Sequence, residues 1–291
     1  MNPARNKIDG FDFVQALARA EQVIRWVPDP EPSPLVQPAH ESLQVGVDLG
    51  TAYVVLVVLD SECKPLAGEY QFAQVVRDGL VVDFLGAVDL LAEMKARVER
   101  RLGESLTHAA TGYPPGVPQV EVRATGNVIE AAGLHCTRMI GEPSAANTLL
   151  GLENGAIIDV GGGTTGIAVL KDGEVVYTAD EPTGGTHFSL VIAGAQDISF
   201  EAAEQMKVDP NEQVRLFPAV RPVMEKVASI IARHVAKSQI RVDSLTLVGG
   251  ASSYPGIAGV VEEYTGLPVS VPDRPVFVTP LGIAMNDKEP E

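Results

Sequence analysis

The stretch that most constrains what this chain can fold into is residues 157–170, in which two apolar runs flank a glycine-rich turn. The first run ends at Asp159, and the second leads into Asp172-Gly173. An Asp-Gly pair between apolar runs is a strong signal for a β-hairpin. We therefore predict a strand, a glycine-rich turn and a second strand that turns back through a hairpin.

The turn has the composition of an anion-binding loop. Gly161, Gly162 and Gly163 carry no Cβ atoms, so their backbone N–H groups can approach phosphate oxygens closely. Thr164 adds a hydroxyl donor, and Asp159, at the strand end, is placed to hold magnesium through water. The glycine spacing also matches the dinucleotide-binding fingerprint, but that motif needs a helix after the glycines, so we reject it. Taken alone, the turn could equally be a glycine bulge between strands.

A second copy of the pattern argues against a simple bulge. Residues 45–60 contain an apolar strand that ends at Asp48, a turn with Gly50 and Thr51, and another strand rich in β-branched residues. Similar segments far apart in one chain indicate a duplicated architecture. We therefore expect two similar lobes that face each other, each offering a turn to one phosphate chain and a carboxylate to one metal ion.

Composition is typical of a two-domain protein that does not bind nucleic acid or anionic membranes. The chain has 291 residues, of which 45% are hydrophobic, enough for about two domains with buried cores. The net charge of −16 predicts neither nucleic acid nor an anionic membrane as a partner, because both repel an acidic surface. A nucleotide stays compatible with this charge if magnesium and backbone amides neutralise its phosphates locally.

Cysteine usage and hydropathy predict a cytoplasmic protein. The two cysteines, Cys63 and Cys136, indicate free thiols in a reducing compartment rather than a disulfide framework. The chain has no apolar run long enough to span a bilayer, and its start does not resemble a signal peptide.

Residues 1–42 predict an amphipathic helix followed by a linker. The helix would run over residues 10–26 from a cap at Asp9, with an apolar face of Phe13, Leu17, Ala20 and Ile24. Residues 27–38 contain five prolines and predict an extended tether. Two interpretations stay open: the helix packs on its own lobe, or it docks onto a partner protein.

The rest of the chain follows an alternating α/β pattern. We expect the first lobe over residues 43–151, the second over 152–278, and a helix that returns to the first lobe within 279–291. An edge strand is predicted over 267–271. The periodicity predicts helices over 85–102, 117–132, 144–150, 199–207, 218–237, 257–264 and 280–285.

Five stretches, in this order, resemble the motifs of the actin-like ATPase superfamily, which includes actin, sugar kinases and DnaK-type chaperones. Residues 48–51 resemble the first phosphate loop, and residues 159–164 the second. Residues 141–146 and 279–285 resemble the two connecting helices, and residues 247–252 the adenosine loop. The match covers about residues 43–286 and implies a two-lobed α/β fold with duplicated ribonuclease-H-like lobes.

This chain resembles DnaK-type chaperones in most detail, and the matching residues here are Gly112–Pro115, Ala131–Leu134 and Glu142–Ala146. The chain ends just after the ATPase domain, so we expect no peptide-binding domain. A small ATPase-only version of this kind resembles the ethanolamine-utilisation protein J family, which is encoded with a bacterial microcompartment and is called chaperone-like. The resemblance implies ATP or ADP with Mg²⁺ as cofactors and a protein client or microcompartment component as partner. It also implies a cytoplasmic location, at or near such a microcompartment.

The resemblance also implies residue roles. Asp48 and Asp159 would hold magnesium through water, and Glu142 would orient the attacking water; together these three form the implied catalytic set. Glu142 could instead serve only as a charge partner for the start of its helix. Glu225 and Lys226 could line the adenine site or form a solvated face. The implied nucleotide-binding residues are Gly50, Thr51, Gly161, Gly162, Gly163, Thr164, Gly184, Gly249, Gly250 and Ser252.

Two departures from the chaperone pattern predict nucleotide binding with slow hydrolysis. DnaK-type enzymes have a catalytic Lys in the first lobe, and no Lys lies between Pro65 and Asp83 here. Their adenosine loop carries an Arg that stacks on adenine, where this chain has Ser253.

Three functions are compatible with these observations: a slow ATPase that acts as a chaperone-like switch, an actin-like scaffold or filament protein whose assembly is controlled by nucleotide, and a small-molecule kinase. The sequence shows no motif for a kinase substrate pocket. It also lacks the P-loop and the Gly-x-Ser-x-Gly nucleophile motif, and its five histidines show no metal-ligand spacing.

Overall fold

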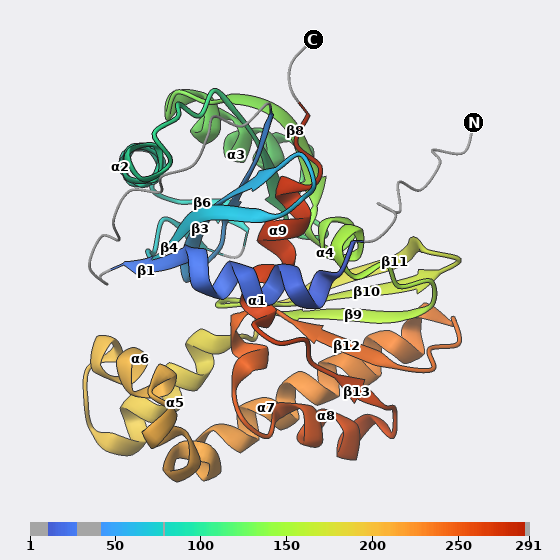
Figure 1. The fold of residues 1–291 in the computed structure, drawn as a ribbon. Helices are drawn as coiled ribbons and strands as arrows, with labels where there is room; N and C mark the ends of the chain where they lie inside the picture. The colour runs from blue at the N-terminus through green and yellow to red at the C-terminus, as the bar shows by residue number, and fades with distance from the viewer. Residues whose placement is uncertain (1–10, 28–41, 78, 289–291) are drawn as a thin grey trace.

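The computed structural model describes residues 11–27, 42–77 and 79–288. Two lobes lie one above the other (Figure 1), each built on a mixed β-sheet. Lobe I is the sheet of order β1-β4-β3-β2-β7-β8 with helices α1, α2 and α3; lobe II is the sheet of order β11-β10-β9-β12-β13 with helices α5 to α8. From β4 to β8 and from β11 to β13, both sheets have three antiparallel strands followed by two parallel ones. This shared topology is the predicted duplication, and the two-lobed actin-like fold is confirmed.

In lobe I, helices α2 and α3 pack on the sheet around a core that includes Leu56, Leu91 and Ile129. Gly103 ends α2 in the left-handed region, at a φ of 74°. The elements of this part are β2 (Leu43–Leu49), β3 (Tyr53–Asp60), β4 (Pro65–Phe72), β5 (Val76–Arg77), β6 (Leu80–Val81), α2 (Phe84–Leu102), β7 (His108–Tyr113), α3 (Gln119–Ala131) and β8 (His135–Gly141).

In lobe II, the core joins the sheet to α5 and α7 through side chains such as Phe188, Ile158 and Ile231. The elements are β9 (Gly155–Val160), β10 (Thr165–Lys171), β11 (Glu174–Glu181), α5 (Gly185–Gln196), α6 (Phe200–Val208), α7 (Pro210–Ser238), β12 (Leu245–Val248), η1 (Gly250–Ser253), α8 (Ile257–Thr265), β13 (Val269–Ser270) and η2 (Pro275–Phe277).

Helices α4 (Glu142–Leu150) and α9 (Val278–Ala284) pack against each other between the two sheets (Figure 1). Their close approach depends on Gly282, because a Cβ there would lie 1.9 Å from the carbonyl oxygen of Ala145. On its other side α9 packs on β2, where a Cβ on Gly46 would lie 2.6 Å from the nitrogen of Ala284. Both predicted connecting helices are therefore present, and we propose residues 151/152 and 278/279 as the lobe limits.

The N-terminal helix packs on lobe I, which corrects the docking interpretation. Helix α1 (Phe13–Val23) is shorter than the predicted 10–26 segment and is capped by Asp12, whose carboxylate accepts from the N–H of Val14. Leu17 is 1% exposed, so the apolar face is already covered by this chain's own core. After α1, β1 (Ile24–Val27) pairs in parallel with β4.

A helix face buried in its own lobe cannot also bind a partner, so the docking interpretation is wrong for the conformation seen here. The predicted cap Asp9 and most of the proline-rich segment lie outside the described residues.

Helix boundaries differ from prediction mainly at α7, which begins at Pro210 rather than Pro218. Asp209 caps it, Pro210 occupies a first-turn position where no N–H is needed, and Pro218 and Pro222 lie inside the helix. The predicted 267–271 strand reduces to two residues, Val269–Ser270. Within the described residues, none of the helices is both long and apolar enough to cross a bilayer.

Candidate functional site

The glycine-rich turns of the two lobes touch each other. The first turn (residues 50–52) joins β2 to β3, and the second turn (residues 161–164) joins β9 to β10. A Cβ on Gly162 would lie 2.4 Å from the Cβ of Ala52, and one on Gly163 would lie 2.7 Å from Cγ2 of Thr51. Real Cβ atoms do not approach so closely, so this contact requires glycine at both positions of the second turn.

The second turn is held by the N-terminus of α5. The N–H of Gly185 donates to the carbonyl of Gly161 at 2.8 Å, and the N–H of Thr186 donates to that of Gly162 at 2.7 Å. Gly184 packs under the turn, because a Cβ there would lie 2.7 Å from the carbonyl oxygen of Gly161. Gly184 thus supports the turn from below, and it does not line the cavity described next.

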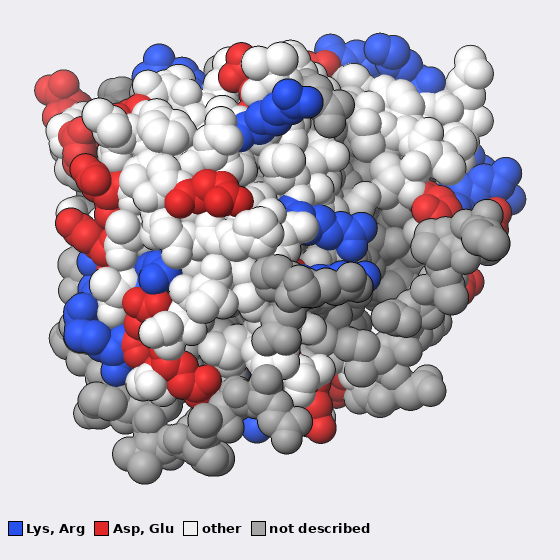
Figure 2. Space-filling model, turned by 90° about the horizontal axis from the view of Figure 1, so that it is seen from above, with Lys and Arg blue, Asp and Glu red and all other residues white. Residues whose placement is uncertain are grey.

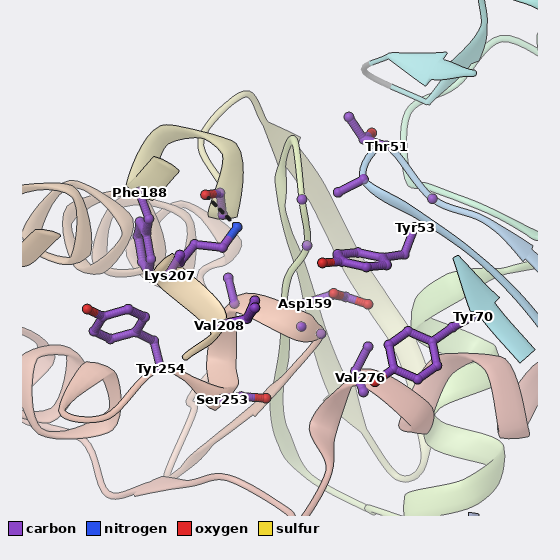
Figure 3. A pocket seen from close by; sticks show the side chains of 18 of the residues that line it. Thr51, Tyr53, Tyr70, Asp159, Phe188, Lys207, Val208, Ser253, Tyr254 and Val276 are labelled. Carbon is purple, nitrogen blue, oxygen red and sulfur yellow. Dashed lines mark hydrogen bonds between the residues drawn. The ribbon is translucent and has the colours of Figure 1, made fainter. Parts of the chain in front are cut away.

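A cavity of about 290 Å³ opens between the lobes beside the two turns (Figure 3). Tyr53 and Tyr70 stand on the lobe I side, and Phe188, Lys207 and Tyr254 on the lobe II side. The predicted site residues that line it are Asp48, Gly50, Thr51, Asp159, Gly161, Gly162, Gly249 and Gly250. Predicted residues from three separate stretches of sequence, 48–51, 159–162 and 249–250, therefore meet in one cavity. Its volume is close to the lower end of the range for small-molecule sites, about 300 Å³.

A smaller cavity of about 90 Å³ adjoins the same turns and shares Asp48, Gly50, Thr51, Asp159, Gly161 and Gly162 with the larger one. Its lining adds Glu142, Gly163 and Thr164, which completes the predicted catalytic set around one point. It also contains Asp180, which sequence reasoning did not identify.

Burial raises the pKa of three carboxyl groups at this point, and neighbouring carboxylates add to the shift of two of them. Burial, and then the charge of Asp159, raise the pKa of Asp48 to about 7. Burial raises the pKa of Glu142 well above its usual range, and the charges of Asp48, Asp159 and Asp180 add to it. Burial also raises the pKa of Asp159, while a hydrogen bond from Thr279 Oγ1 to its Oδ2, 2.9 Å long, acts in the opposite direction. Such a cluster favours a bound cation, because neutralisation lets all of the groups ionise.

The donor set fits hydrated Mg²⁺. Carboxylate oxygens are the ligands that this ion prefers, and it usually keeps several of its waters. Among the described residues, no three His, Cys, Asp or Glu side chains are arranged to hold a metal ion directly. Asp48 and Asp159 could therefore hold a cation only with the help of water or of a ligand's own oxygens, as the sequence predicts.

The structure brings a charged network into the larger cavity that sequence reasoning missed. Lys207 Nζ on α6 lies 2.7 Å from Glu204 Oε2 and donates to the carbonyl of Gly185 at 3.2 Å. Ser189 Oγ donates to the same Glu204 oxygen at 2.5 Å. From the opposite lobe, Tyr53 Oη donates to Glu204 Oε1 at 3.4 Å. Burial lowers the pKa of Lys207, despite the opposing charge of Glu204.

Glu204 and Lys207 are three residues apart, which is the only sequence signal for this pair. Such spacing is common on solvated helix faces, so it does not identify a site before the fold is known.

Ser252 and Glu225 lie away from the cavity lining. Ser252 is buried, and its Oγ donates to the carbonyl of Val248 at 2.6 Å, so the neighbouring Ser253 lines the cavity in its place. Glu225 is exposed on α7 and pairs with Arg221, as expected for a solvated face.

Comparison with known proteins places the chain among relatives of known family. The chain is 44% identical to the ethanolamine utilization protein EutJ of Escherichia coli (strain K12), a match that covers 85% of this chain and 87% of the relative. It is similar to the crystal structure of EutJ from Carboxydothermus hydrogenoformans, with 46% identity, a TM-score of 0.81 and coverage of 86% of this chain and 92% of the other.

More distant matches extend the likeness. A chaperone protein HscA homolog of Burkholderia thailandensis is 27% identical over 72% of this chain and 42% of its own length. MreB 5 of Spiroplasma citri bound to AMPPNP has 18% identity, a TM-score of 0.68 and coverage of 85% and 96%, which supports the fold alone. The cell division protein FtsA family matches residues 156–282, and the MreB/Mbl protein family matches residues 67–196. On the strength of the 44% identity over most of both chains, this protein belongs to the ethanolamine utilization protein EutJ family.

Proposed function

We propose that this protein binds ATP or ADP with Mg²⁺ between its lobes, hydrolyses ATP slowly and acts as a nucleotide-controlled, chaperone-like switch in ethanolamine utilisation. The observation that carries the proposal is the contact between the first and second turns, which come from opposite lobes, beside a cavity of about 290 Å³. The name of the E. coli relative, at 44% identity, supports the link to ethanolamine utilisation.

The larger cavity would take the nucleoside and the two turns would take the phosphates. Tyr53, Phe188 and Tyr254 offer aromatic surface, and the Glu204–Lys207 pair offers hydrogen bonds to a ribose. The backbone amides and hydroxyls of the turns would bind phosphate oxygens, and Asp48 and Asp159 would hold the hydrated cation. A structural neighbour, MreB 5 of Spiroplasma citri, is bound to AMPPNP, which supports an adenine nucleotide as the ligand to test.

Glu142 would orient the attacking water from the smaller cavity. Its position at the start of α4 also suits a helix charge partner, and the two roles are compatible. Among the described residues that line the larger cavity, Lys207 is the only Lys or Arg, and it comes from lobe II. Because lobe I supplies no lysine there, we expect turnover to be slow. The partner would be a protein client or a microcompartment component.

Calorimetry with purified protein tests the proposal. ATP and ADP should bind in the presence of Mg²⁺, more weakly in EDTA, and small-angle scattering should show a smaller radius of gyration in the complex, because one ligand touches both lobes. Absence of binding for both nucleotides in Mg²⁺ would reject the proposal.

Nucleotide-controlled assembly is a second candidate, favoured by exposed apolar side chains on both lobes. Leu85 on α2 and Val120 on α3 are 73% and 76% exposed, and Val214 on α7 is 82% exposed. The face seen from above is largely uncharged between scattered acidic and basic side chains (Figure 2). A head-to-tail contact between lobe I of one copy and lobe II of the next would build a filament. Concentration-dependent light scattering that requires ATP would favour this function over the monomeric switch.

A further inference from the structure

A fourth carboxylate faces the place where the two turns meet. Asp180, near the end of β11, lines the smaller cavity with Asp48, Glu142 and Asp159. Its Oδ1 atom is fully buried. After burial and the charges of Asp48 and Asp159, the charge of Asp180 also raises the pKa of Glu142, so the two carboxyl groups are close enough to interact.

The register of the sheet explains how Asp180 reaches this place. Gly166 in β10 pairs with Asp159 in β9 on one side and with Asp180 in β11 on the other. Residues directly opposite each other in antiparallel strands project from the same face of a sheet. The three residues therefore form one row whose middle position is open: a Cβ on Gly166 would lie 3.6 Å from Asp180 Oδ1 and 3.8 Å from the Cβ of Asp159.

The acidic lining of the smaller cavity favours a positively charged ligand. Its described residues include four carboxylates and no Lys or Arg. At about 90 Å³ the cavity has room for several water molecules of a hydrated ion. Both glycine turns line the same space, so phosphate oxygens would enter it together with the cation.

We propose that Asp180 is a further acidic residue of the cation site, where it accepts hydrogen bonds from water on the divalent cation that accompanies the nucleotide. The inference rests on the proposed function, since the cation arrives with the phosphates. Asp180 is a positioning residue: it acts through cation-bound water and does not touch the reacting phosphate. Removal of groups that orient a metal's ligands typically lowers metal affinity by about 10- to 100-fold.

The test measures Mn²⁺ binding by electron paramagnetic resonance in the presence of ATP, and ATP binding by calorimetry in EDTA. Asp180→Asn should bind Mn²⁺ about 10-fold more weakly than the wild-type protein, with unchanged ATP affinity in EDTA. Asp89→Asn removes the same charge from an exposed position on α2 and should leave both affinities unchanged.

Transfer of the carboxylate to the neighbouring strand gives a second, independent measurement. A Cβ at Gly166 would meet only ordinary van der Waals contacts, and the backbone there is not in the left-handed region. Gly166→Asp combined with Asp180→Ala should therefore recover part of the Mn²⁺ affinity that Asp180→Ala alone loses. A defect caused by misfolding would not be repaired by this second change.

The two proposals fail in different ways. Mn²⁺ affinity in Asp180→Asn equal to that of the wild-type protein overturns the role of Asp180 and leaves the proposed function intact. If the wild-type protein binds no ATP with or without the metal, the proposed function fails, and this inference fails with it.

Discussion

The first and second turns occupy matching positions in two sheets of the same topology, yet they contribute different chemistry. The second turn is mostly bare backbone, and α5 fixes it through two N–H donors, on Gly185 and Thr186. The first turn carries the side chains of Thr51 and Ala52, which fit against the glycines of the second. Duplication has thus produced two complementary surfaces rather than two equal ones.

The two aspartates differ in the same way. Asp159 is supported by Thr279, which reaches it from α9, the helix that packs on both lobes. The pKa of Asp48 is raised to about 7 by burial and by Asp159 itself. The ionised form of Asp159 is therefore supported by a hydrogen bond from α9, whereas the shift of Asp48 comes from burial and from the neighbouring charge.

The largest effect is expected from Gly162→Ala, which breaks the contact between the turns. Its Cβ would overlap that of Ala52 at 2.4 Å, and overpacking of this kind costs about 1–3 kcal/mol. We expect affinity for Mg²⁺–ATP, measured by calorimetry, to fall by about 5- to 150-fold.

Two further variants sharpen this measurement. Gly194→Ala, on α5 and outside the lining of both cavities, should bind normally, because a Cβ there meets nothing within 4 Å. Ala52→Gly should restore binding when combined with Gly162→Ala, and failure to do so would show that the turns need not touch in the complex.

The next effect concerns the paired carboxylates. Asp48→Asn and Asp159→Asn should each weaken Mg²⁺–ATP binding by about 10- to 100-fold while circular dichroism shows an intact fold. Affinity in EDTA should change much less, because the lost interaction passes through the cation. Unchanged affinity in both variants would remove the two aspartates from the cation site.

A smaller effect, on stability, distinguishes Asp48 in the metal-free protein. Its pKa rises from 3.8 to about 7 on folding, so between these pH values the folded state holds more protons than the unfolded state. Stability contributed by this group is therefore present below pH 4 and lost as pH rises through about 7. In EDTA, Asp48→Asn should melt at a higher temperature than the wild-type protein above pH 7, and the difference should vanish near pH 4. A difference that is independent of pH would contradict this assignment.

The smallest effect is expected from Thr279→Val, which removes the hydrogen bond to Asp159. The loss of one such bond costs about 1 kcal/mol, or roughly five-fold in Mg²⁺–ATP affinity. Thr178→Val, on the exposed side of β11, is the matched control and should have no effect. If Thr279→Val binds Mg²⁺–ATP with the same affinity as the wild-type protein, the hydrogen bond from Thr279 to Asp159 does not contribute to binding.

Local sequence patterns predicted the elements that depend on neighbouring residues. Each of the two turns is encoded within a short stretch, because the strand, the Asp and the glycine or glycines lie within a few residues of one another. The connecting helices also followed from local signals and from the family resemblance. Helix ends were less predictable: α7 tolerates Pro218 and Pro222 in its interior, and residues 24–27 form a strand because β4 offers them an open edge.

The sequence by itself determined the two strand–turn–strand segments that contain Asp48 and Asp159, and it predicts that their backbone binds phosphate. Only the tertiary structure decided what surrounds them. Asp180 joins the site through pairing with Gly166, and Lys207 and Glu204 arrive on a helix more than 40 residues after the second turn begins. The sequence pattern of α1 is compatible with packing on its own lobe or on a partner protein, and the structure shows that its own lobe covers the apolar face. The physical reason is the same in each case: local pattern fixes the conformation of a segment, whereas contacts between distant segments depend on how whole sheets and helices pack.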